Sequence, residues 1–363
     1  MTYNGNNNNN SSFCISSGIF NINIKIIIVS FSLLFFSFYI NNVIIANGQK
    51  SNFPELTIND NQNNDINIVA VGDFYCNDET KDTIKNIIAI DPELIITTGD
   101  HVKDVNSIKC WAEMSQSIKD KMQIAIGNHD FEFQKIYKQL VEYHNLTSPY
   151  YSHDFHNIHF ISFSTEHPFE EGSQQYEFIK NDLEKASKNT DIDWIIIHQH
   201  KPLFSTRNDM DVAQELRDTY HPLFEKYNVD LVISSHNQYY ERTYPLSTDS
   251  KIYNPDKVET VTIYDNETDL EWIYTKPLEN NSIAEEYPNP SYYHNPNGTI
   301  FLTVGTAGDE LKEIMISDDY YVIQDNENFG FLNLKLENNG SKIVGEFHSN
   351  DNDKRIDHFE MVK

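Results

Sequence analysis

Basic residues are scarce in this chain of 363 residues, in which 27 Lys and Arg stand against 55 Asp and Glu for a formal net charge of −28. So acidic a chain offers no basic surface to neutralise phosphates, and we expect no nucleic acid among its partners. Cysteine is also rare, at three residues, which excludes a scaffold built on several disulfides. No Gly-x-Gly-x-x-Gly loop occurs, which argues against a dinucleotide-binding domain. Hydrophobic residues make up 39%, enough for a packed core in one large or two ordinary domains.

The first 46 residues differ in composition from the rest. A polar, Asn-rich stretch that we expect to be disordered precedes Lys25, and fifteen uncharged, mostly apolar residues follow from Ile26 to Ile40. A cation, a short apolar core and then the small residue Ala46 are typical of a cleaved signal peptide. Counting on to Ala46 lengthens the apolar stretch to about 20 residues, which would suit an uncleaved single-pass anchor. We favour cleavage, with a linker at 47–64 and the folded domain at 65–361.

Either interpretation of the leader puts the folded domain outside the cytosol, secreted or in an endomembrane or lysosomal lumen. Membrane contact is expected only if the leader is retained. Sequons for N-glycosylation agree with this placement and lie at Asn145, Asn266, Asn280, Asn297 and Asn339. In an oxidising compartment Cys76 and Cys110 could form one disulfide, or they could be two separate buried thiols, and the sequence leaves both open.

Residues 65–240 alternate short β-type runs with stretches of helical spacing, which is typical of a layered α/β domain. The runs are Ile66–Val71, Leu94–Thr98, Met122–Ile126, Ile158–Phe163, Trp194–Ile197 and Asp230–Ile233, and the helical stretches are Glu79–Ile90, Phe131–His144, Tyr176–Lys188 and Val212–Tyr227. Strand-like segments without clear helices follow at Val258–Tyr264, Thr299–Val304, Gly330–Leu336, Lys342–His348 and Ile356–Met361. We expect these to be antiparallel strands that complete a sheet, with a surface insertion over Tyr264–Pro296.

Polar residues directly follow five of the strands. The sequences are Gly72-Asp73, Gly99-Asp100, Gly127-Asn128-His129-Asp130, His198-Gln199-His200-Lys201-Pro202 and His236-Asn237-Gln238. In open α/β sheets the carboxyl ends of the strands meet at one crevice, where binding sites form. Carboxylate, amide and imidazole groups gathered there suit a divalent transition metal.

In this order, the series GD, GD, GNHD, HxP and SHNQYYERTYP resembles the motifs of the calcineurin-like metallophosphoesterase superfamily, and of purple acid phosphatases in particular. The segments GTIFLTVGTAG at 298–308 and ENFGFLNL at 327–334 are similar to the end of that domain. The resemblance implies an α/β fold of the metallophosphoesterase type, a two-sheet β-sandwich flanked by helices. It also implies a dinuclear metal site that hydrolyses phosphate monoesters.

Carried over residue by residue, the resemblance gives an unequal pair of metal sites. Asp100 would bridge two ions, and the second ion would also be held by Asn128, His200 and His236. The first ion would keep Asp73, but Lys103 and Gln238 stand where the family has a Tyr and a His. We therefore expect one divalent ion, zinc, iron or manganese, with two as the alternative.

Three other positions near the motifs bear on the chemistry. The resemblance gives His129 the role of assisting the leaving oxygen or stabilising charge in the transition state. Tyr75 replaces the Gly or His of the first motif, and Lys103 would bring a fixed positive charge near the first ion.

Two functions of different classes are compatible with these motifs. The favoured one is a secreted or lumenal metal-dependent phosphoesterase, an acid phosphatase-like hydrolase of small phosphate monoesters with a partly eroded first metal site. The alternative is a catalytically inactive glycoprotein that keeps the fold as a binding or scaffold module. Lys103 and Gln238 favour the alternative, whereas the retained ligands and His129 favour the enzyme.

Overall fold

The computed structural model describes residues 66–104, 106–132, 134–206, 211–247, 258–264, 271–277, 291–315, 320–351 and 354–363. The leader and linker predicted for residues 1–64 lie outside these ranges, as do the sequons at Asn266 and Asn280 and most of the predicted insertion. Within the described ranges, no helix is long and apolar enough to cross a membrane.

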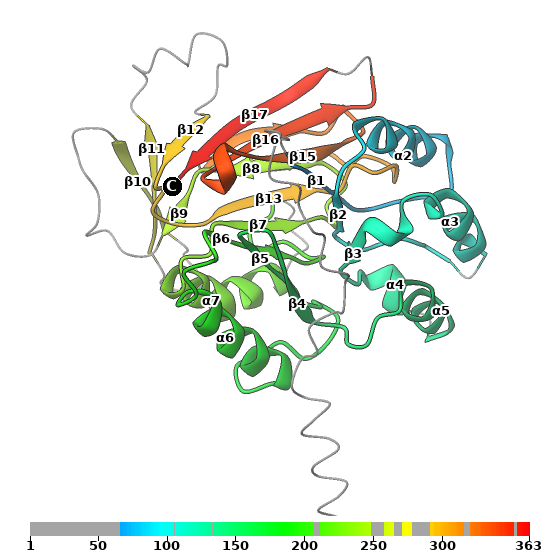
Figure 1. The fold of residues 1–363 in the computed structure, drawn as a ribbon, viewed down its shortest axis with the longest axis horizontal. Helices are drawn as coiled ribbons and strands as arrows, with labels where there is room; N and C mark the ends of the chain where they lie inside the picture. Colours follow the sequence, from blue (N-terminus) through cyan, green and yellow to red (C-terminus); the bar gives the residue numbers. More distant parts are fainter. Residues whose placement is uncertain are drawn as a thin grey trace, which may run out of the picture. The chain divides into compact units, whose positions relative to one another are not determined.

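Strands of the described residues form two seven-stranded sheets, which confirms the predicted two-sheet sandwich (Figure 1). In order across the first sheet, the strands are β12 (Tyr292–His294), β17 (Arg355–Val362), β16 (Lys342–Ser349), β15 (Gly330–Glu337), β1 (Ile66–Val71), β2 (Leu94–Thr97) and β3 (Met122–Ile124). Across the second they are β14 (Tyr321–Asp325), β8 (Tyr240–Thr243), β13 (Ile300–Val304), β7 (Leu231–Ser234), β6 (Trp194–His198), β5 (Ile158–Ser162) and β4 (Tyr151–Phe155). A three-stranded sheet holds β10 (Val258–Tyr264), β11 (Glu271–Pro277) and β9 (Leu246–Ser247).

The register of the strands brings the predicted site loops to one edge of each sheet. Strands β1, β2 and β3 run parallel, with Ile68 opposite Leu94 and Ile95 opposite Met122, so that the loops after them leave at the same end. Strands β6 and β7 are parallel neighbours in the second sheet. The C-terminal strands β15, β16 and β17 add to β1 as antiparallel neighbours, as predicted. Strand β13 pairs antiparallel with β8, as predicted, and also pairs in parallel with β7. Strand β10 differs from the prediction, because it pairs with β11 in the three-stranded sheet.

Two of the described helices begin after a capping side chain. Helix α2 (Asp78–Ile90) begins after Asn77, whose side chain accepts from the amide of Thr80 at 2.9 Å, and its first turn carries Asp78 and Glu79. Helix α6 (Gln174–Ala186) is capped in the same way by Ser173. The other helices are α3 (Ser107–Ser115), α4 (Asn128–Glu132), α5 (Gln134–His144) and α7 (Asp211–Lys226).

Apolar side chains form two packed layers. The larger cluster joins the two sheets, with Ile68 of β1, Phe160 of β5 and Leu302 of β13 among its buried members. The smaller cluster lies between the second sheet and helices α6 and α7, and includes Leu183 and Phe224. Figure 1 shows α6 and α7 on one side of the sandwich and α2 to α5 beside β1 to β3. Because these strands are buried on both faces, their sequences are continuous apolar runs.

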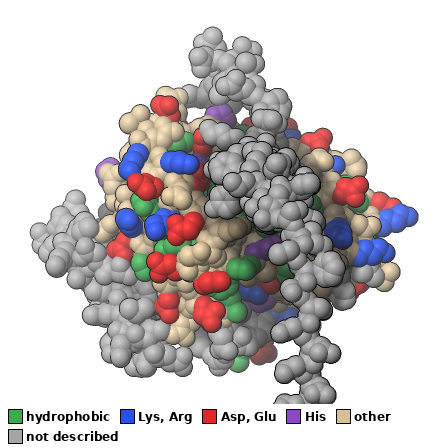
Figure 2. Space-filling model, turned by 90° about the horizontal axis from the view of Figure 1, so that it is seen from below, with side chains coloured by type: hydrophobic (Ala, Val, Ile, Leu, Met, Phe, Trp, Pro, Cys, Tyr) green, Lys and Arg blue, Asp and Glu red, His purple; other side chains and the backbone are tan. Residues whose placement is uncertain are grey.

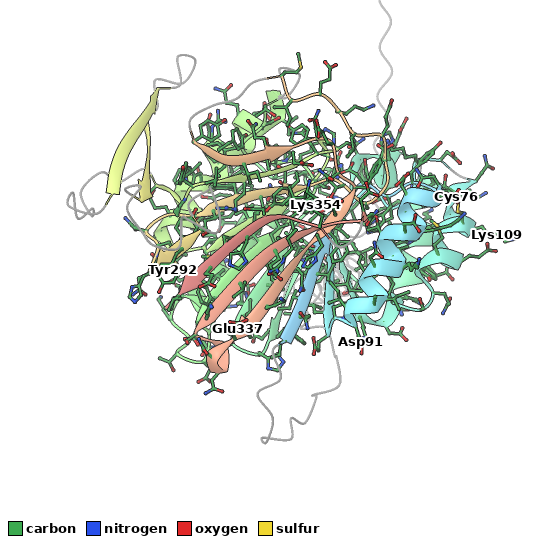
Figure 3. The ribbon with its side chains drawn as sticks, turned by 90° about the horizontal axis from the view of Figure 1, so that it is seen from above. Cys76, Asp91, Lys109, Tyr292, Glu337 and Lys354 are labelled. Carbon is green, nitrogen blue, oxygen red and sulfur yellow. A yellow bond between two sulfur atoms is a disulfide. The ribbon has the colours of Figure 1, made fainter. Side chains whose placement is uncertain are left out.

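Cys76 and Cys110 form a disulfide with their Cα atoms 6.1 Å apart, which settles the alternative that the sequence left open. Figure 3 shows Cys76 close to Lys109, the chain neighbour of Cys110, at the side of the molecule that carries α2. The bond joins the loop after β1 to helix α3 and closes a loop of 34 residues in sequence. A cross-link over such a separation restricts the unfolded chain and stabilises the fold by roughly 2–4 kcal/mol.

Charged side chains at the surface are mixed in sign. On the described part of the face in Figure 2, acidic and basic side chains are interspersed. Helix α6 and the turn after it carry such neighbours, with Lys188 2.6 Å from Glu184 and Lys180 4.0 Å from Glu177. Because these pairs are exposed, each contributes little to stability.

We predict that acid destabilises the fold through His153 of β4. This side chain is 8% exposed, and neither ring nitrogen has a hydrogen-bond partner among the described residues. Burial, together with the charge of His159, lowers the pKa of His153 from 6.5 to about 3. The unfolded state therefore takes up a proton first, so stability is lost as the pH falls below 6.5, by about 2 kcal/mol at pH 5.

The test compares the free energy of unfolding at pH 7 and pH 5 for the wild type and for His153→Phe. The variant should lose about 2 kcal/mol less than the wild type between the two pH values. The exposed His294, replaced in the same way, serves as the control. An equal loss in the wild type and in His153→Phe would contradict the prediction.

Candidate metal centre

Three of the residues that the sequence placed at strand ends take a backbone conformation that bends the chain sharply. Asp73, Asp100 and His236 have φ values of 60°, 52° and 71°, in the left-handed region. Gly99 precedes Asp100 with a φ of 95°, and a Cβ there would lie 2.7 Å from Nδ1 of His200. In these loops the left-handed backbone fixes the direction in which the polar side chains point.

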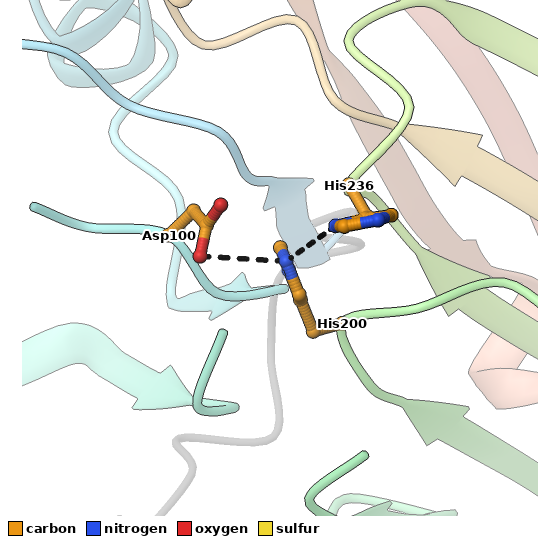
Figure 4. Close-up of side chains that lie close together, drawn as sticks. All are labelled: Asp100, His200 and His236. Carbon is orange, nitrogen blue, oxygen red and sulfur yellow. Dashed lines mark hydrogen bonds and ion pairs between the residues drawn. The ribbon is translucent and has the colours of Figure 1, made fainter. Parts of the chain in front are cut away.

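His200 is the centre of the cluster. Its side chain is fully buried, and Nε2 lies 2.9 Å from Oδ1 of Asn128, 3.1 Å from Nδ1 of His236 and 3.4 Å from Oδ1 of Asp100. Figure 4 shows Asp100, His200 and His236 turned toward one another from three different loops. Asp100, His200 and His236 are also close enough to offer their ligand atoms to one ion.

The other ring nitrogen of His200 fixes the tautomer. Nδ1 donates to the carbonyl oxygen of Thr98 at 2.8 Å, which leaves Nε2 to present its lone pair to the cluster. Nε2 then faces an amide oxygen, a carboxylate oxygen and a second imidazole nitrogen. A cation among them can be held by the two oxygens and by the lone pairs of both imidazoles.

Asp100 adds a second observation in favour of a cation. Its side chain is almost fully buried, and Oδ1 accepts from the amide of His129 at 2.9 Å. Oδ2 is buried without a hydrogen-bond partner among the described residues. A buried carboxylate oxygen without a partner is costly, so an ion beside it is the arrangement that fits.

Asp100 and His200 shift each other's pKa, and these shifts affect metal binding. Burial alone would raise the pKa of Asp100, but the charge and hydrogen bond of His200 and the neighbouring His129 hold it below its usual value. Burial alone would lower the pKa of His200, but the charge of Asp100 raises it to about 9. Near neutral pH a proton therefore stands on His200 when no ion is bound. Metal binding must displace this proton, which makes binding weaker in acid.

Asp130 joins the two loops that carry the ligands Asp100 and Asn128 through hydrogen bonds. Its buried carboxylate accepts from the amides of Gly127 at 3.0 Å, His101 at 2.9 Å and Val102 at 3.2 Å. It also accepts from Nδ1 of His101 at 2.9 Å. One side chain thus holds the loop after β2, which carries Asp100, against the loop after β3, which carries Asn128. His101 is buried and bound within this network.

The first-metal position implied by the resemblance is built differently. Both carboxylate oxygens of Asp73 accept hydrogen bonds, Oδ2 from the amide of His236 at 2.6 Å and Oδ1 from Nε2 of Gln238 at 3.1 Å. The reverse orientation of the Gln238 amide would set its oxygen against that carboxylate. Burial, opposed by the charge of His200 and helped by that of Asp100, raises the pKa of Asp73 to about 6. The hydrogen bonds of Asp73 do not fit an ion at this position.

Lys103, which stands where the family has a Tyr, has an ion-pair partner in the structure. Its ammonium pairs with Asp309, a residue that the sequence gave no reason to single out. The pair joins the loop after β2 to the loop after β13 across 206 positions, so no local pattern could have revealed it.

The structure thus gathers Asp100, Asn128, His200 and His236, and it places Asp73 beside them as a hydrogen-bonded neighbour. His129 lies at the rim with a side chain 33% exposed, its Nε2 4.0 Å from Oδ2 of Asp100 and its Nδ1 3.7 Å from Glu132. The orienting contacts of Thr98 and Ser235 with His200 were not predicted.

Comparisons with known proteins agree with this geometry. The family model described as calcineurin-like phosphoesterase matches residues 66–240, the stretch that carries all five predicted ligands and His129. Residues 66–240 belong to the calcineurin-like phosphoesterase family. Purple acid phosphatase 15 of Arabidopsis thaliana is 23% identical over 227 residues, which cover 52% of this chain and 41% of that protein.

Two further relatives bear on fold and activity. The structure of purple acid phosphatase PPD1 from seeds of yellow lupin (Lupinus luteus) aligns with a TM-score of 0.62 at 21% identity, and the alignment covers 83% of this chain and 54% of PPD1. Probable inactive purple acid phosphatase 9 of Arabidopsis thaliana is 31% identical over 104 residues, which cover 28% of this chain and 16% of that protein. The chain therefore matches only about two fifths or less of the length of these two Arabidopsis phosphatases.

We predict that restoring two residues rebuilds the first-metal position implied by the resemblance. Lys103→Tyr with Gln238→His supplies a phenolate and an imidazole beside Asp73 and Asp100, and removes the hydrogen bond from Gln238 to Asp73. Metal content should rise from about one to about two ions per chain, and each single change should have much less effect than the pair.

Elemental analysis of the wild type, both single variants and the double variant measures this directly. With iron, a visible band from the new tyrosinate should accompany the second ion. A folded double variant that still binds one ion would show that the position is closed by more than these two residues, and two ions in the wild type would contradict our account of Gln238.

Proposed function

We propose that this chain is a metal-dependent phosphoesterase that hydrolyses small phosphate monoesters with one divalent ion. The observation that carries the proposal is the convergence of Asp100, Asn128 and His236 on Nε2 of His200, with the buried Oδ2 of Asp100 beside it. Two imidazoles, one carboxylate and one amide oxygen suit zinc, iron or manganese.

The proposed roles of the side chains follow from their contacts. Asp100, Asn128, His200 and His236 would hold the ion, which supplies Lewis-acid polarisation of a phosphoryl oxygen and activation of water. Thr98 orients His200 through its carbonyl group, and Asp130 holds the two ligand loops together. Ligands fixed in this way lose little freedom when the ion binds.

His129 is the proposed proton donor to the leaving oxygen. Its backbone amide is fixed by Asp100 at 2.9 Å, while its ring remains partly exposed at the rim of the cluster. A side chain in that place can meet the leaving group of a substrate whose phosphate lies at the ligands. General acid catalysis of this kind typically contributes a factor of 10²–10⁴.

A compartment outside the cytosol is part of the proposal. The disulfide between Cys76 and Cys110 suits an oxidising environment, and the sequons at Asn145 and Asn339 lie on exposed residues that can carry glycans. Asn297 is less suitable because it is half-buried and its sequon partner Thr299 is fully buried. A mature chain that begins after about Ala46 and is glycosylated would support secretion, whereas retention of the apolar segment would support the anchor.

A binding or scaffold module without activity is the second candidate function. The amide of Gln238 at Asp73 favours it, because this contact removes the position for a second ion. The similarity to a probable inactive purple acid phosphatase of Arabidopsis thaliana also favours it. The enzyme remains the better candidate, since the four-ligand cluster and His129 are both intact.

We predict that the purified protein hydrolyses p-nitrophenyl phosphate when loaded with zinc, iron or manganese, and that His129→Asn lowers kcat by about 10²–10⁴-fold. Metal content should not change, because the backbone contact of residue 129 with Asp100 is retained. His294→Asn, at an exposed position of β12, is the matched control. Metal-loaded wild type without any turnover would favour the binding module, and a fall in metal content in His129→Asn would contradict the role given to this ring.

A further inference from the structure

A pocket of ≈ 400 Å³ adjoins the candidate metal centre. Its lining includes Tyr75 and Asn77 from the loop after β1, Lys103 from the loop after β2, Asp309 from the loop after β13, and Phe329 just before β15. A volume of this size accommodates a small organic group.

Backbone hydrogen bonds place the pocket next to the ligands. The loop after β13 is joined to the loop after β1 by three of them, from Gly72 to Val304 at 2.9 Å, from Ala307 to Gly72 at 3.0 Å and from Asp309 to Asp73 at 2.9 Å. Asp309 therefore lies beside Asp73, and Tyr75 follows Asp73 by two residues. A phosphate ester held at His200 and Asp100 has this pocket within reach of its alcohol part.

The two aromatic walls are held on fixed backbone. The amide of Tyr75 donates to Oγ1 of Thr80 at 2.9 Å, and the next residue, Cys76, is in the disulfide. The carbonyl group of Phe329 accepts from Asn350 at 2.8 Å, and Gly330 donates to Thr306 at 3.0 Å. Tyr75 is nevertheless 42% exposed, so a bound group can reach its side chain.

Each charged side chain of the pocket lining has an ion-pair partner, and Glu310, which also lines the pocket, pairs with Lys312 at 2.7 Å. The ammonium of Lys103 pairs with the carboxylate of Asp309, so the two groups neutralise each other. A neutral ring can enter such a pocket without the desolvation cost that an unpaired charge would impose. Aromatic walls attract planar rings by stacking and by edge contacts.

We propose that this pocket receives the leaving group of the substrate and selects phosphate monoesters of planar aromatic alcohols, with Tyr75 and Phe329 as the specificity-determining residues. The proposal rests on the phosphoesterase function proposed above, because the phosphate end of the substrate must be held at the metal centre. The walls are preformed, so little freedom is lost when the ring binds.

The first experiment compares kcat/KM for 1-naphthyl phosphate and glycerol 2-phosphate in the wild type, Tyr75→Ala, Phe329→Ala and Tyr75→Phe. Differences in leaving-group chemistry cancel when each variant is compared with the wild type on the same substrate. Tyr75→Ala and Phe329→Ala should each lower the naphthyl value about five- to tenfold, and leave the glycerol value within about twofold. Tyr75→Phe should retain the naphthyl value. Ile88→Ala, an exposed apolar position at the other end of α2, is the control.

A second experiment separates failure of this inference from failure of the proposed function. Saturation-transfer NMR records contact of the protein with the ring protons of 1-naphthylphosphonate, which is not hydrolysed. Ring saturation in the wild type that falls in Tyr75→Ala supports the pocket even if no ester is turned over. Turnover with equal losses on both substrates, or ring saturation unchanged in Tyr75→Ala, overturns the inference and leaves the phosphoesterase function intact.

Discussion

The contact between Nδ1 of His200 and the carbonyl oxygen of Thr98 determines how the rest of the site is arranged. It directs Nε2 toward Asp100, Asn128 and His236, and it does so in the interior, where His200 and Asp100 are almost fully buried. The carboxylate oxygen of Asp100 and the amide oxygen of Asn128 both lie close to Nε2, and a positive charge between them stabilises this arrangement. The left-handed backbone at Asp100 and His236 and the close approach of Gly99 are the local costs of bringing these groups together.

The sandwich makes such a convergence stable. Parallel pairing of β1, β2 and β3 sends three ligand loops out at one end of the first sheet, and β6 and β7 do the same in the second. Apolar contacts between the sheets fix the distance between these two sets of loops. Asp130 and the disulfide between Cys76 and Cys110 then join loop to loop and loop to helix. The position beside Asp73 differs. There the carboxylate accepts hydrogen bonds from Gln238 and His236, and a second ion would need the same oxygens.

Much of this arrangement could be predicted from the sequence, because buried parallel strands read as short apolar runs and their polar ends are easily seen. The bounds of β1 and β10 agree with the predicted segments, and the predicted ligands of one ion lie together. Strand β4 could not be predicted, since His153 and Asp154 interrupt its apolar pattern although His153 is buried. Helix α3 is short and lacks a side-chain cap, so it gives little periodic signal. The pairs of Lys103 with Asp309 and Arg242 with Asp357 join residues more than one hundred positions apart, and only the folded chain brings them into contact.

The number of divalent ions that the domain binds is the most direct test of this account. Elemental analysis of the purified wild type should find about one ion per chain, and His236→Ala should lose it, because removal of one of four ligands costs several kcal/mol of binding. Two ions in the wild type would contradict the hydrogen-bonded account of Asp73 and Gln238. A wild type without metal, or equal metal content in His236→Ala, would contradict the assignment of the cluster around His200 as a metal centre.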